Sequence, residues 1–251
     1  MKKIFLLLLL VTNICFCAIL EPFPFKDSNL TAQYPPFNIY LFGHSTNINT
    51  NEITLSPIST FFTIPTVDTV EISSSNNGDS TEIYISGVNN GINYTESVIL
   101  NGTSSVTLSH KYNIINFAKN IGTKNILGDI YIYLTTTITG GVPIDSSKIL
   151  SKINSTTNTT ENGFFYMPVQ YKGIINYLNF QKITGDTSEI NIYVTRGTQP
   201  KIKLCTFLLT DMALNPIINY PLFGNDFFEV TAIASSTTEI TMFGSININM
   251  Y

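Results

Sequence analysis

Charged residues are scarce in this sequence, at 12% of 251 residues, which is about half of the usual share. Arg196 is the only arginine, and beyond the first three residues the closest basic side chains are those of Lys201-Ile202-Lys203. Binding to a phosphate backbone requires clustered lysine or arginine. The net charge of −4 points the same way. We therefore expect no nucleic acid among the partners.

Catalytic motifs are missing as well. Only two histidines occur, His44 and His110, and they stand far apart in the sequence. There is no glycine-rich phosphate loop, no nucleophile elbow and no cysteine–histidine spacing of a metal site. Each histidine is interpreted as a surface or edge residue, so we expect no catalytic residue, no cofactor, no metal and no enzymatic activity. Paired carboxylates for glycoside hydrolysis remain the alternative, because the sequence does not show which acids meet in space.

Two acidic turns have the oxygen ligands that calcium prefers. They are Asn76-Asn77-Gly78-Asp79 and Gly185-Asp186-Thr187-Ser188-Glu189. Glycine beside asparagine or aspartate is also the ordinary composition of a hairpin turn. We interpret both segments as turns, with calcium binding as the alternative.

Cysteine is rare too, and two of the three cysteines lie in an N-terminal export signal. Met1-Lys2-Lys3 is a basic start, residues 4–11 are apolar, and Cys15-Phe16-Cys17-Ala18 supplies small residues for cleavage after Cys17. The apolar run is shorter than the roughly 20 residues that span a bilayer. Residues 1–17 are therefore predicted to be a cleaved signal peptide, and the mature chain to be secreted, on a cell surface or in a virion. Membrane contact is expected only through this leader if it stays uncleaved.

Cleavage would leave Cys205 as the one remaining cysteine, so no disulfide is expected to stabilise the fold. The alternating pattern from Lys201 to Phe207 predicts that Cys205 is a small buried side chain. Export also gives meaning to the Asn-x-Ser/Thr triplets, which are glycosylation sites in a eukaryotic host. The predicted sites are Asn29, Asn93, Asn101, Asn154 and Asn158.

Alternation of apolar and polar residues is what the sequence has in abundance. Between Glu82 and Leu134 it recurs in several short runs with a period of two, the pattern of strands with one buried face. Asn101-Gly102 between two runs is a strong hairpin signal. A five-residue loop over 101–105 would set Leu100 against Val106, and this register is preferred because it pairs apolar side chains across the strands.

The pattern as a whole predicts an all-β fold with two β-sandwich, jelly-roll-like domains after the signal peptide. No α-helix is expected, and a short helical turn around 146–153 is the only helical candidate. The polar stretch before residue 163 is interpreted as a linker, because it can bury little apolar area. The predicted parts are a Pro-rich extended segment at 18–66, a first sandwich at 67–144 that takes strands from 37–66, a Ser/Thr/Asn linker at 145–162 and a second sandwich at 163–251.

Two tyrosines on one predicted strand, Tyr131 and Tyr133, fall on the face opposite Ile130, Ile132 and Leu134. Aromatic side chains outside a core are common in contacts with sugars or partner proteins. In a chain with so little charge we prefer the interpretation that a second sheet or another subunit covers them. Partner contact through these tyrosines is the alternative.

Several runs stand in a recognisable order over roughly residues 65–251. They are a strand ending in Gly87-Val88-Asn89, the segment Glu96 to Thr103, Gly128-Asp129-Ile130, Thr139-Gly140-Gly141-Val142-Pro143, Phe165-Tyr166-Met167-Pro168 and the run Glu229 to Ser236. This order resembles a family of virion structural proteins from marine bacteriophages and some large DNA viruses.

The resemblance implies a two-part β structural component of a virus particle without catalytic residues. Phage virion proteins made in the cytoplasm need no signal peptide, so the leader favours a virus of a eukaryote or a cellular surface protein that shares the fold. The first hypothesis is a structural protein that acts by β-sandwich packing and self-association, with other virion or surface proteins as further partners. The alternative is a secreted or cell-surface binding module that recognises glycans or a partner protein.

Overall fold

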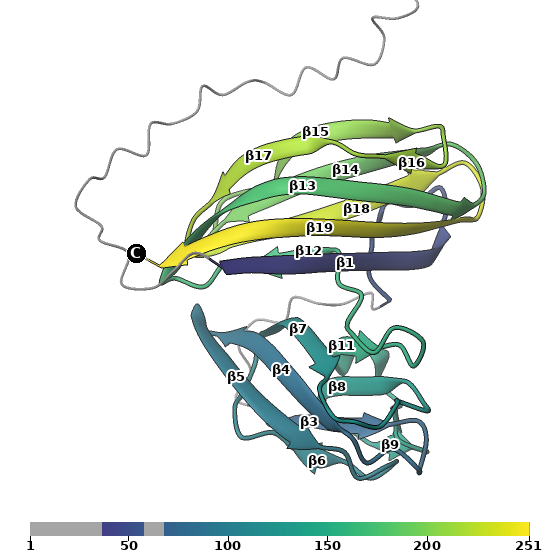
Figure 1. Ribbon diagram of the computed structural model, residues 1–251, viewed down its shortest axis with the longest axis vertical. Helices are drawn as coiled ribbons and strands as arrows, with labels where there is room; N and C mark the ends of the chain where they lie inside the picture. The colour runs from purple at the N-terminus through teal and green to yellow at the C-terminus, as the bar shows by residue number, and fades with distance from the viewer. Residues whose placement is uncertain (1–36, 58–67, 251) are drawn as a thin grey trace, which may run out of the picture.

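The computed structural model describes residues 37–57 and 68–250, which form two stacked β-sandwiches built from antiparallel strands (Figure 1). The predicted all-β fold class is confirmed. A single 3-10 turn, η1 (Ser146–Lys148), is the only helical element in the described ranges, none of which holds a helix suited to crossing a bilayer. The predicted signal peptide at 1–17 and Asn29 lie outside the described residues.

The first sandwich packs a four-stranded sheet on a three-stranded sheet, with strand orders β11-β8-β3-β6 and β5-β4-β7. Its core is mainly aliphatic and includes Ile72, Ile83 and Ile132, because alternate residues of each strand point inward. The strands are β3 (Val70–Ser74), β4 (Glu82–Asn89), β5 (Ile92–Ile99), β6 (Val106–Thr107), β7 (Ile114–Asn120), β8 (Ile130–Leu134) and β11 (Ile149–Ile153), with a small hairpin of β9 (Ile138–Thr139) and β10 (Val142–Pro143) beside them.

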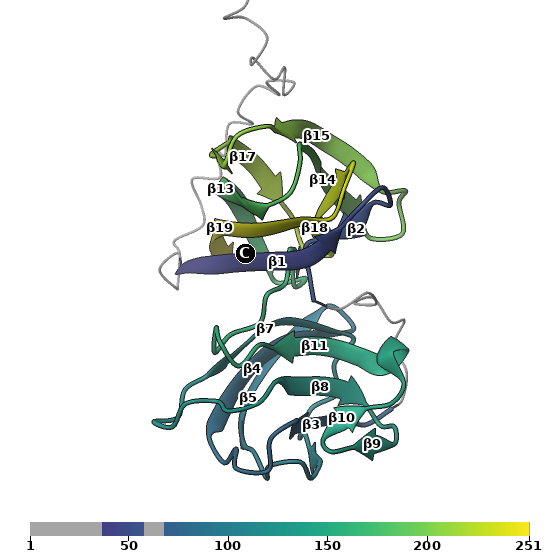
Figure 2. The ribbon, with the colours of Figure 1, turned by 90° about the vertical axis from the view of Figure 1, so that its right-hand side faces the viewer.

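The second sandwich has longer strands and a core that contains several phenylalanines, Phe165, Phe180 and Phe228 among them. One sheet holds β1 (Phe37–Ile48), β19 (Thr238–Met250), β13 (Tyr171–Thr184), β16 (Ala213–Leu214) and β17 (Ile217–Leu222). The facing sheet holds β12 (Phe164–Tyr166), β18 (Asp226–Ala234), β14 (Ser188–Arg196), β15 (Ile202–Leu209) and β2 (Ile53–Thr54). Figure 2 shows the two sandwiches edge-on, one above the other.

The first sandwich is inserted into the second. Strand β1 pairs with β19 from Phe37↔Ile248 to Ile48↔Thr238, and β2 pairs with β18, although both precede the first sandwich in the sequence. The prediction that strands of 37–66 join the first sandwich is therefore wrong for the part of that range that the structure describes. The physical reason is burial: Leu41, Ile48 and Leu55 complete the core of the second sandwich.

The predicted linker at 145–162 is also corrected. Strand β11 lies within that range and pairs with β8, with Ile153 opposite Ile130. Leu150 and Ile153 are buried in the first core, and the buried hydroxyl of Ser151 accepts a hydrogen bond from Asn162 Nδ2 at 3.3 Å. The predicted helical turn is present only at η1, because the residues that follow it pair as a strand.

The predicted hairpin at Asn101-Gly102 does not form. Strand β5 pairs with β4, whereas β6 pairs with β3 in the opposite sheet, so the segment between them crosses from one sheet to the other. The true hairpin lies at Asn90-Gly91, where Asn89 is opposite Ile92. Both turn residues have positive φ, 50° and 79°, as a two-residue type I′ turn requires.

Candidate functional site: the cleft between the two sandwiches

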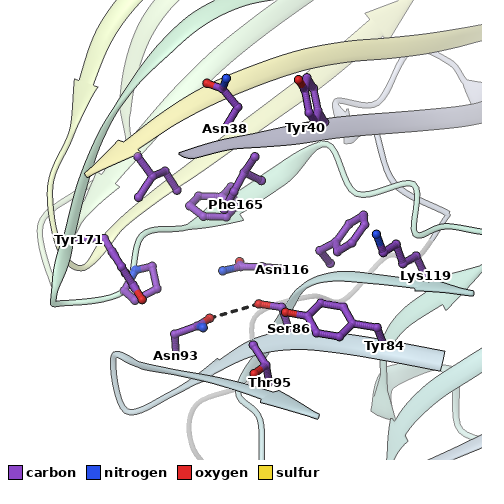
Figure 3. Close-up of a pocket in the computed structure, with 14 residues that line it drawn as sticks. Asn38, Tyr40, Tyr84, Ser86, Asn93, Thr95, Asn116, Lys119, Phe165 and Tyr171 are labelled. Carbon is purple, nitrogen blue, oxygen red and sulfur yellow. Dashed lines mark hydrogen bonds between the residues drawn. The ribbon is translucent and has the colours of Figure 1, made fainter. Parts of the chain in front are cut away.

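A cleft of about 420 Å³ lies where the two sandwiches meet (Figure 3). Its floor is the outer face of the β5-β4-β7 sheet, and its opposite wall comes from the start of β1 together with the segment that joins β12 to β13. Both sandwiches therefore contribute side chains to one concave site, which is a common place for a ligand.

The floor follows directly from strand alternation. On β4, Ile83 and Ile85 point into the first core, so Tyr84 and Ser86 point outward into the cleft. The register sets Ser86 opposite Phe117 of β7 and opposite Thr95 of β5, and these outward side chains stand in one cross-strand row. Lys119 stands opposite Tyr84 in the next row.

The opposite wall brings aromatic rings over this floor. Tyr40 of β1 is 68% exposed, and Asn38 two residues earlier lies on the same face of the strand. Phe165 and Tyr171 complete the wall from the second sandwich (Figure 3), and Pro168 lies in the lining between them in sequence. The lining thus combines aromatic rings with amide and hydroxyl groups.

Two asparagines of the cleft, Asn38 and Asn93, each have an NH2 group that can donate a hydrogen bond to a ligand. Ser86 Oγ donates to Asn93 Oδ1 at 3.3 Å, and Asn247 Nδ2 donates to Asn38 Oδ1 at 3.2 Å. In each pair the amide oxygen of the cleft residue accepts, which leaves its NH2 group as a donor.

Charge in the lining comes from a single side chain. Lys119 is exposed, and its Nζ lies 5.9 Å from the centroid of the Phe117 ring. The described lining contains no carboxylate, histidine or cysteine, so it offers binding groups and no acid–base pair.

Contacts around Asn116 hold the two sandwiches together beside the cleft. Asn116 Nδ2 donates to the Tyr166 carbonyl at 2.8 Å, and its Oδ1 accepts from the Tyr166 N–H at 2.9 Å. Ile114 packs with Phe164 and Phe227 in a small apolar cluster at the same junction. Val169 N–H also donates to the Gly91 carbonyl at the hairpin tip, at 2.8 Å. The walls of the cleft are therefore fixed relative to one another.

His44 lies on β1, at the edge of its sheet, and joins two carboxylates at this junction. Its Nδ1 lies 3.1 Å from Glu161 Oε2 and its Nε2 lies 3.0 Å from Glu239 Oε1. The hydrogen bond to Glu161 raises the pKa of His44, partial burial opposes this, and Glu239 raises the pKa further. An imidazolium that donates from both nitrogens fits this geometry, and no sequence motif marks it.

His110 belongs to a structural network around Glu96. The Glu96 carboxylate accepts the N–H of Ser109 at 2.8 Å and of His110 at 3.0 Å, as well as the Tyr112 hydroxyl at 2.9 Å. Burial alone would raise the pKa of Glu96, but these three donors together lower it. The network fixes the loop before β7.

A second cluster of polar side chains lies on the outer face of the β18-β14-β15 sheet. Glu52 Oε1 accepts from Tyr193 OH at 2.8 Å, from Asn191 Nδ2 at 3.2 Å and from the Thr231 hydroxyl. Lys201 Nζ lies over the Tyr193 ring, 4.0 Å from its centroid. Burial and the bond to Glu52 raise the pKa of Tyr193 to about 12. These partners satisfy one another and tie the segment before β2 to the sheet.

Tyr131 and Tyr133, for which partner contact was the alternative to being covered, differ in the structure. Tyr133 is fully buried and its hydroxyl lies 3.1 Å from Ser73 Oγ, which donates to the Gly141 carbonyl at 2.7 Å. It is therefore not available for contact with a partner, because the loop around Gly141 covers it. Tyr131 is half-buried, with Lys152 Nζ 5.6 Å from its ring centroid. Neither tyrosine lines the cleft.

The predicted glycosylation sites in the described ranges occupy different settings. Asn93 lines the cleft, and Asn101 is exposed in the crossing between the two sheets. Asn154 begins a turn by accepting the Thr156 N–H at 3.1 Å, and Asn158 closes the same turn region with a φ of 58°. Attachment of a glycan at any of them stays a prediction.

The carboxylates of Asp79 and Asp186, in the two acidic segments, accept hydrogen bonds from neighbouring loops. Asp79 is buried, and its carboxylate accepts the N–H of Leu127 at 2.8 Å and of Gly128 at 3.0 Å. Asp186 Oδ2 accepts from Ser236 Oγ at 2.8 Å. Within the described ranges, no three acidic, histidine or cysteine side chains gather as a metal site. Cys205 is buried in the second core, as predicted.

Comparisons with known proteins give little. No protein-family model matches the sequence, and no curated protein matches it. A chain in the structure of infectious bursal disease virus Gt strain is 9% identical over 87% of this chain and 73% of that chain, with a TM-score of 0.22. The PBSX exported protein XepA is 9% identical over 85% of each chain, also at 0.22.

No family match confirms the specific family that the motifs resemble. TM-scores below 0.5 carry no argument about what a chain does.

Sequence reasoning missed the cleft residues. Tyr84, Phe117 and Lys119 are outward positions of alternating strands, so their exposure could have been read from the pattern. The pairing of β4 with β7 and the approach of β1 are long-range features that one sequence does not display.

Proposed function

We propose that this chain is a non-enzymatic structural protein of a virus particle or surface, which acts by β-sandwich packing and self-association. The observation that carries the proposal is an apolar patch on the outer face of the sheet that contains β1, β19, β13 and β17. In Figure 1 these strands lie side by side on the side of the second sandwich that faces the viewer.

The patch follows from the register of the sheet. Tyr40 of β1 is opposite Ser245 of β19, which is opposite Tyr177 of β13, and Tyr177 is in turn opposite Ile217 of β17. Tyr40, Tyr177 and Ile217 are 68%, 47% and 75% exposed, whereas the small Ser245 between the two tyrosines is 5% exposed. The row therefore presents large, mainly apolar side chains from three of the four strands, β1, β13 and β17.

A second row strengthens the patch. Phe42 of β1 is opposite Phe243 of β19, and their ring centroids lie 4.7 Å apart. Phe243 is 45% exposed despite its size. Contiguous exposed apolar surface of this kind marks a protein contact, and the low charge of the chain leaves little else to keep copies apart.

The test is sedimentation of the chain over a range of concentrations. We expect association that weakens or disappears in the double variant Tyr177→Ser with Ile217→Ser. The matched control is Leu208→Ser, which removes a 61% exposed apolar side chain from β15 in the facing sheet. A chain that stays monomeric at micromolar concentration, or a control that weakens association equally, would contradict the proposal.

A further inference from the structure

The cleft between the sandwiches has the composition of a sugar site. We propose that it binds a saccharide that carries a carboxylate, such as a glycan ending in a sialic acid or a uronic acid. This binding does not depend on the structural role proposed above, and of the residues named for the apolar patch only Tyr40 also lines the cleft.

Aromatic rings provide the first part of the argument. Tyr84 lies on the floor, and Tyr40 and Tyr171 lie on the opposite wall (Figure 3). Phe117 of β7 also belongs to the floor, where it stands opposite Ser86. Aromatic faces suit the apolar C–H side of a sugar ring, and tyrosine adds a hydroxyl at its polar end. A cleft lined in this way holds a flat, amphipathic ligand between its walls.

Polar groups provide the second part. Asn38, Asn93 and Thr95 add amide and hydroxyl groups between the rings, and both amides keep an NH2 donor. A purely apolar ligand would leave these groups without partners, which is costly when water is excluded. A saccharide supplies hydroxyl oxygens for each of them.

Charge selects the acidic class of saccharide. Among the described residues of the lining, Lys119 alone is charged, in a chain whose net charge is −4. No salt bridge engages its Nζ within the described ranges. A ligand carboxylate would complete a charge-assisted hydrogen bond that the protein itself does not provide.

Size and rigidity fit the same ligand. The volume of about 420 Å³ falls within the range of small-molecule sites. The two hydrogen bonds between Asn116 and the Tyr166 backbone fix the walls before a ligand arrives, which lowers the entropic cost of binding.

Asn93 gives the site a second property. Its side chain lines the cleft, and Asn93-Tyr94-Thr95 is a glycosylation triplet. A glycan attached there would occupy the space that the saccharide needs. The binding experiment therefore uses the full chain from a bacterial host, which attaches no such glycan.

The experiment is titration calorimetry with three short oligosaccharides, one ending in sialic acid, one ending in a uronic acid and one neutral. We expect binding of at least one acidic sugar, with the neutral sugar weaker. Lys119→Gln should weaken acidic-sugar binding by about two- to fivefold and leave the neutral sugar unchanged. Lys124→Gln is the matched control, because Lys124 is an exposed lysine of the same sandwich outside the lining.

Phe117→Ala should weaken all sugars, whereas Tyr177→Ala on the apolar patch should leave sugar binding intact. A thermal melt of each variant confirms that the fold persists, and Lys119→Gln keeps the test valid because it changes only an exposed side chain. Binding by only one acidic sugar identifies the source of the carboxylate. No binding, equal binding of the neutral sugar, or an unchanged Lys119→Gln variant would overturn the proposal.

Discussion

The two sandwiches reach stability in different ways. The first is continuous in sequence over the described residues 68–162, has short strands around an aliphatic core, and holds its loops with the buried carboxylate of Asp79 and with Glu96. The second has strands of up to 14 residues around a core that adds three phenylalanines to its aliphatic side chains, and the outer face of its β1-β19-β13-β17 sheet carries the apolar patch. One of its sheets needs β1, which comes from before the inserted first sandwich.

This difference predicts different behaviour when the chain is divided. A sandwich whose strands pair with strands nearby in the sequence can fold alone. A sandwich that takes one strand from a distant part of the sequence depends on the whole chain. It also separates two roles: polar loops and the cleft floor belong to the first sandwich, and the apolar patch belongs to the second.

The largest effect is expected from separating the sandwiches. Residues 163–250 lack Leu41, Ile48 and Leu55, and burial of each contributes about 2 kcal/mol. Together with the lost pairing along β19, this approaches the whole stability of a domain, about 5–15 kcal/mol. Residues 68–162 alone should melt cooperatively and give a dispersed NMR spectrum, and residues 163–250 alone should not. If the 163–250 fragment folded alone, the proposed difference between the two sandwiches in independent folding would be contradicted.

An intermediate effect is expected at Glu96, which holds the loop before β7. Glu96→Ala should lower the free energy of unfolding by about 2–3 kcal/mol, because two backbone donors and the Tyr112 hydroxyl lose a charged acceptor. Chemical denaturation at neutral pH measures this, with the exposed Glu82→Gln as the control.

The same site gives a pH dependence. The folded pKa of Glu96 is lowered, so its contribution is fully present above the unfolded value near 4.5 and is lost as the pH falls through the folded pKa. The difference in free energy of unfolding between Glu96→Ala and the unsubstituted protein should therefore become smaller as the pH falls below about 4.5. A difference that stays constant down to that pH would show that packing, and not charge, holds the loop.

The smallest effect is expected at His44, where the sandwiches meet. Its folded pKa is raised, so the stabilisation is complete below the unfolded value near 6.5 and is lost as the pH rises through the folded pKa. His44→Gln should cost about 0.5–1 kcal/mol at pH 6, allowing for solvent screening. The cost should shrink in alkaline buffer, as melts at both pH values would show. If the loss of stability caused by His44→Gln instead grew with pH, His44 would stabilise the fold as a neutral imidazole.

Local patterns predicted much of the fold. Alternation located β4, β8 and the strand around Cys205, because one buried face leaves a period of two in the sequence. It did not identify partners, since a strand's pattern reports its face and not its neighbour. Strand β1 was therefore predicted in the first sandwich, whereas it pairs with β19 of the second.

The two Asn-Gly pairs show most clearly that a local sequence pattern does not determine which strands pair. Asn90-Gly91 closes a hairpin, whereas Asn101-Gly102 crosses between sheets, where Gly102 N–H donates to the Asp79 carbonyl at 2.8 Å. A Cβ on Gly102 would lie 2.4 Å from the Asn77 carbonyl oxygen, so this glycine serves close packing as well as its positive φ. The dipeptide is the same, and the tertiary setting decides its role.

The site was harder to predict than the fold. Tyr131 and Tyr133 were candidates because they oppose an apolar face, but the loop around Gly141 covers Tyr133. The cleft depends on the approach of β1 to β4 and β7, a contact between residues far apart in sequence. Polar residues in 145–162 likewise concealed β11, whose buried Ser151 is paired and not solvated.

The most direct measurement of the central claim is hydrogen exchange of the chain at low and high protein concentration. If copies meet through the apolar patch, backbone amides of β13 and β17 around Tyr177 and Ile217 should gain protection as the concentration rises, while β15 should not change. Exchange that is independent of concentration, or added protection confined to β15, would contradict assembly through this face.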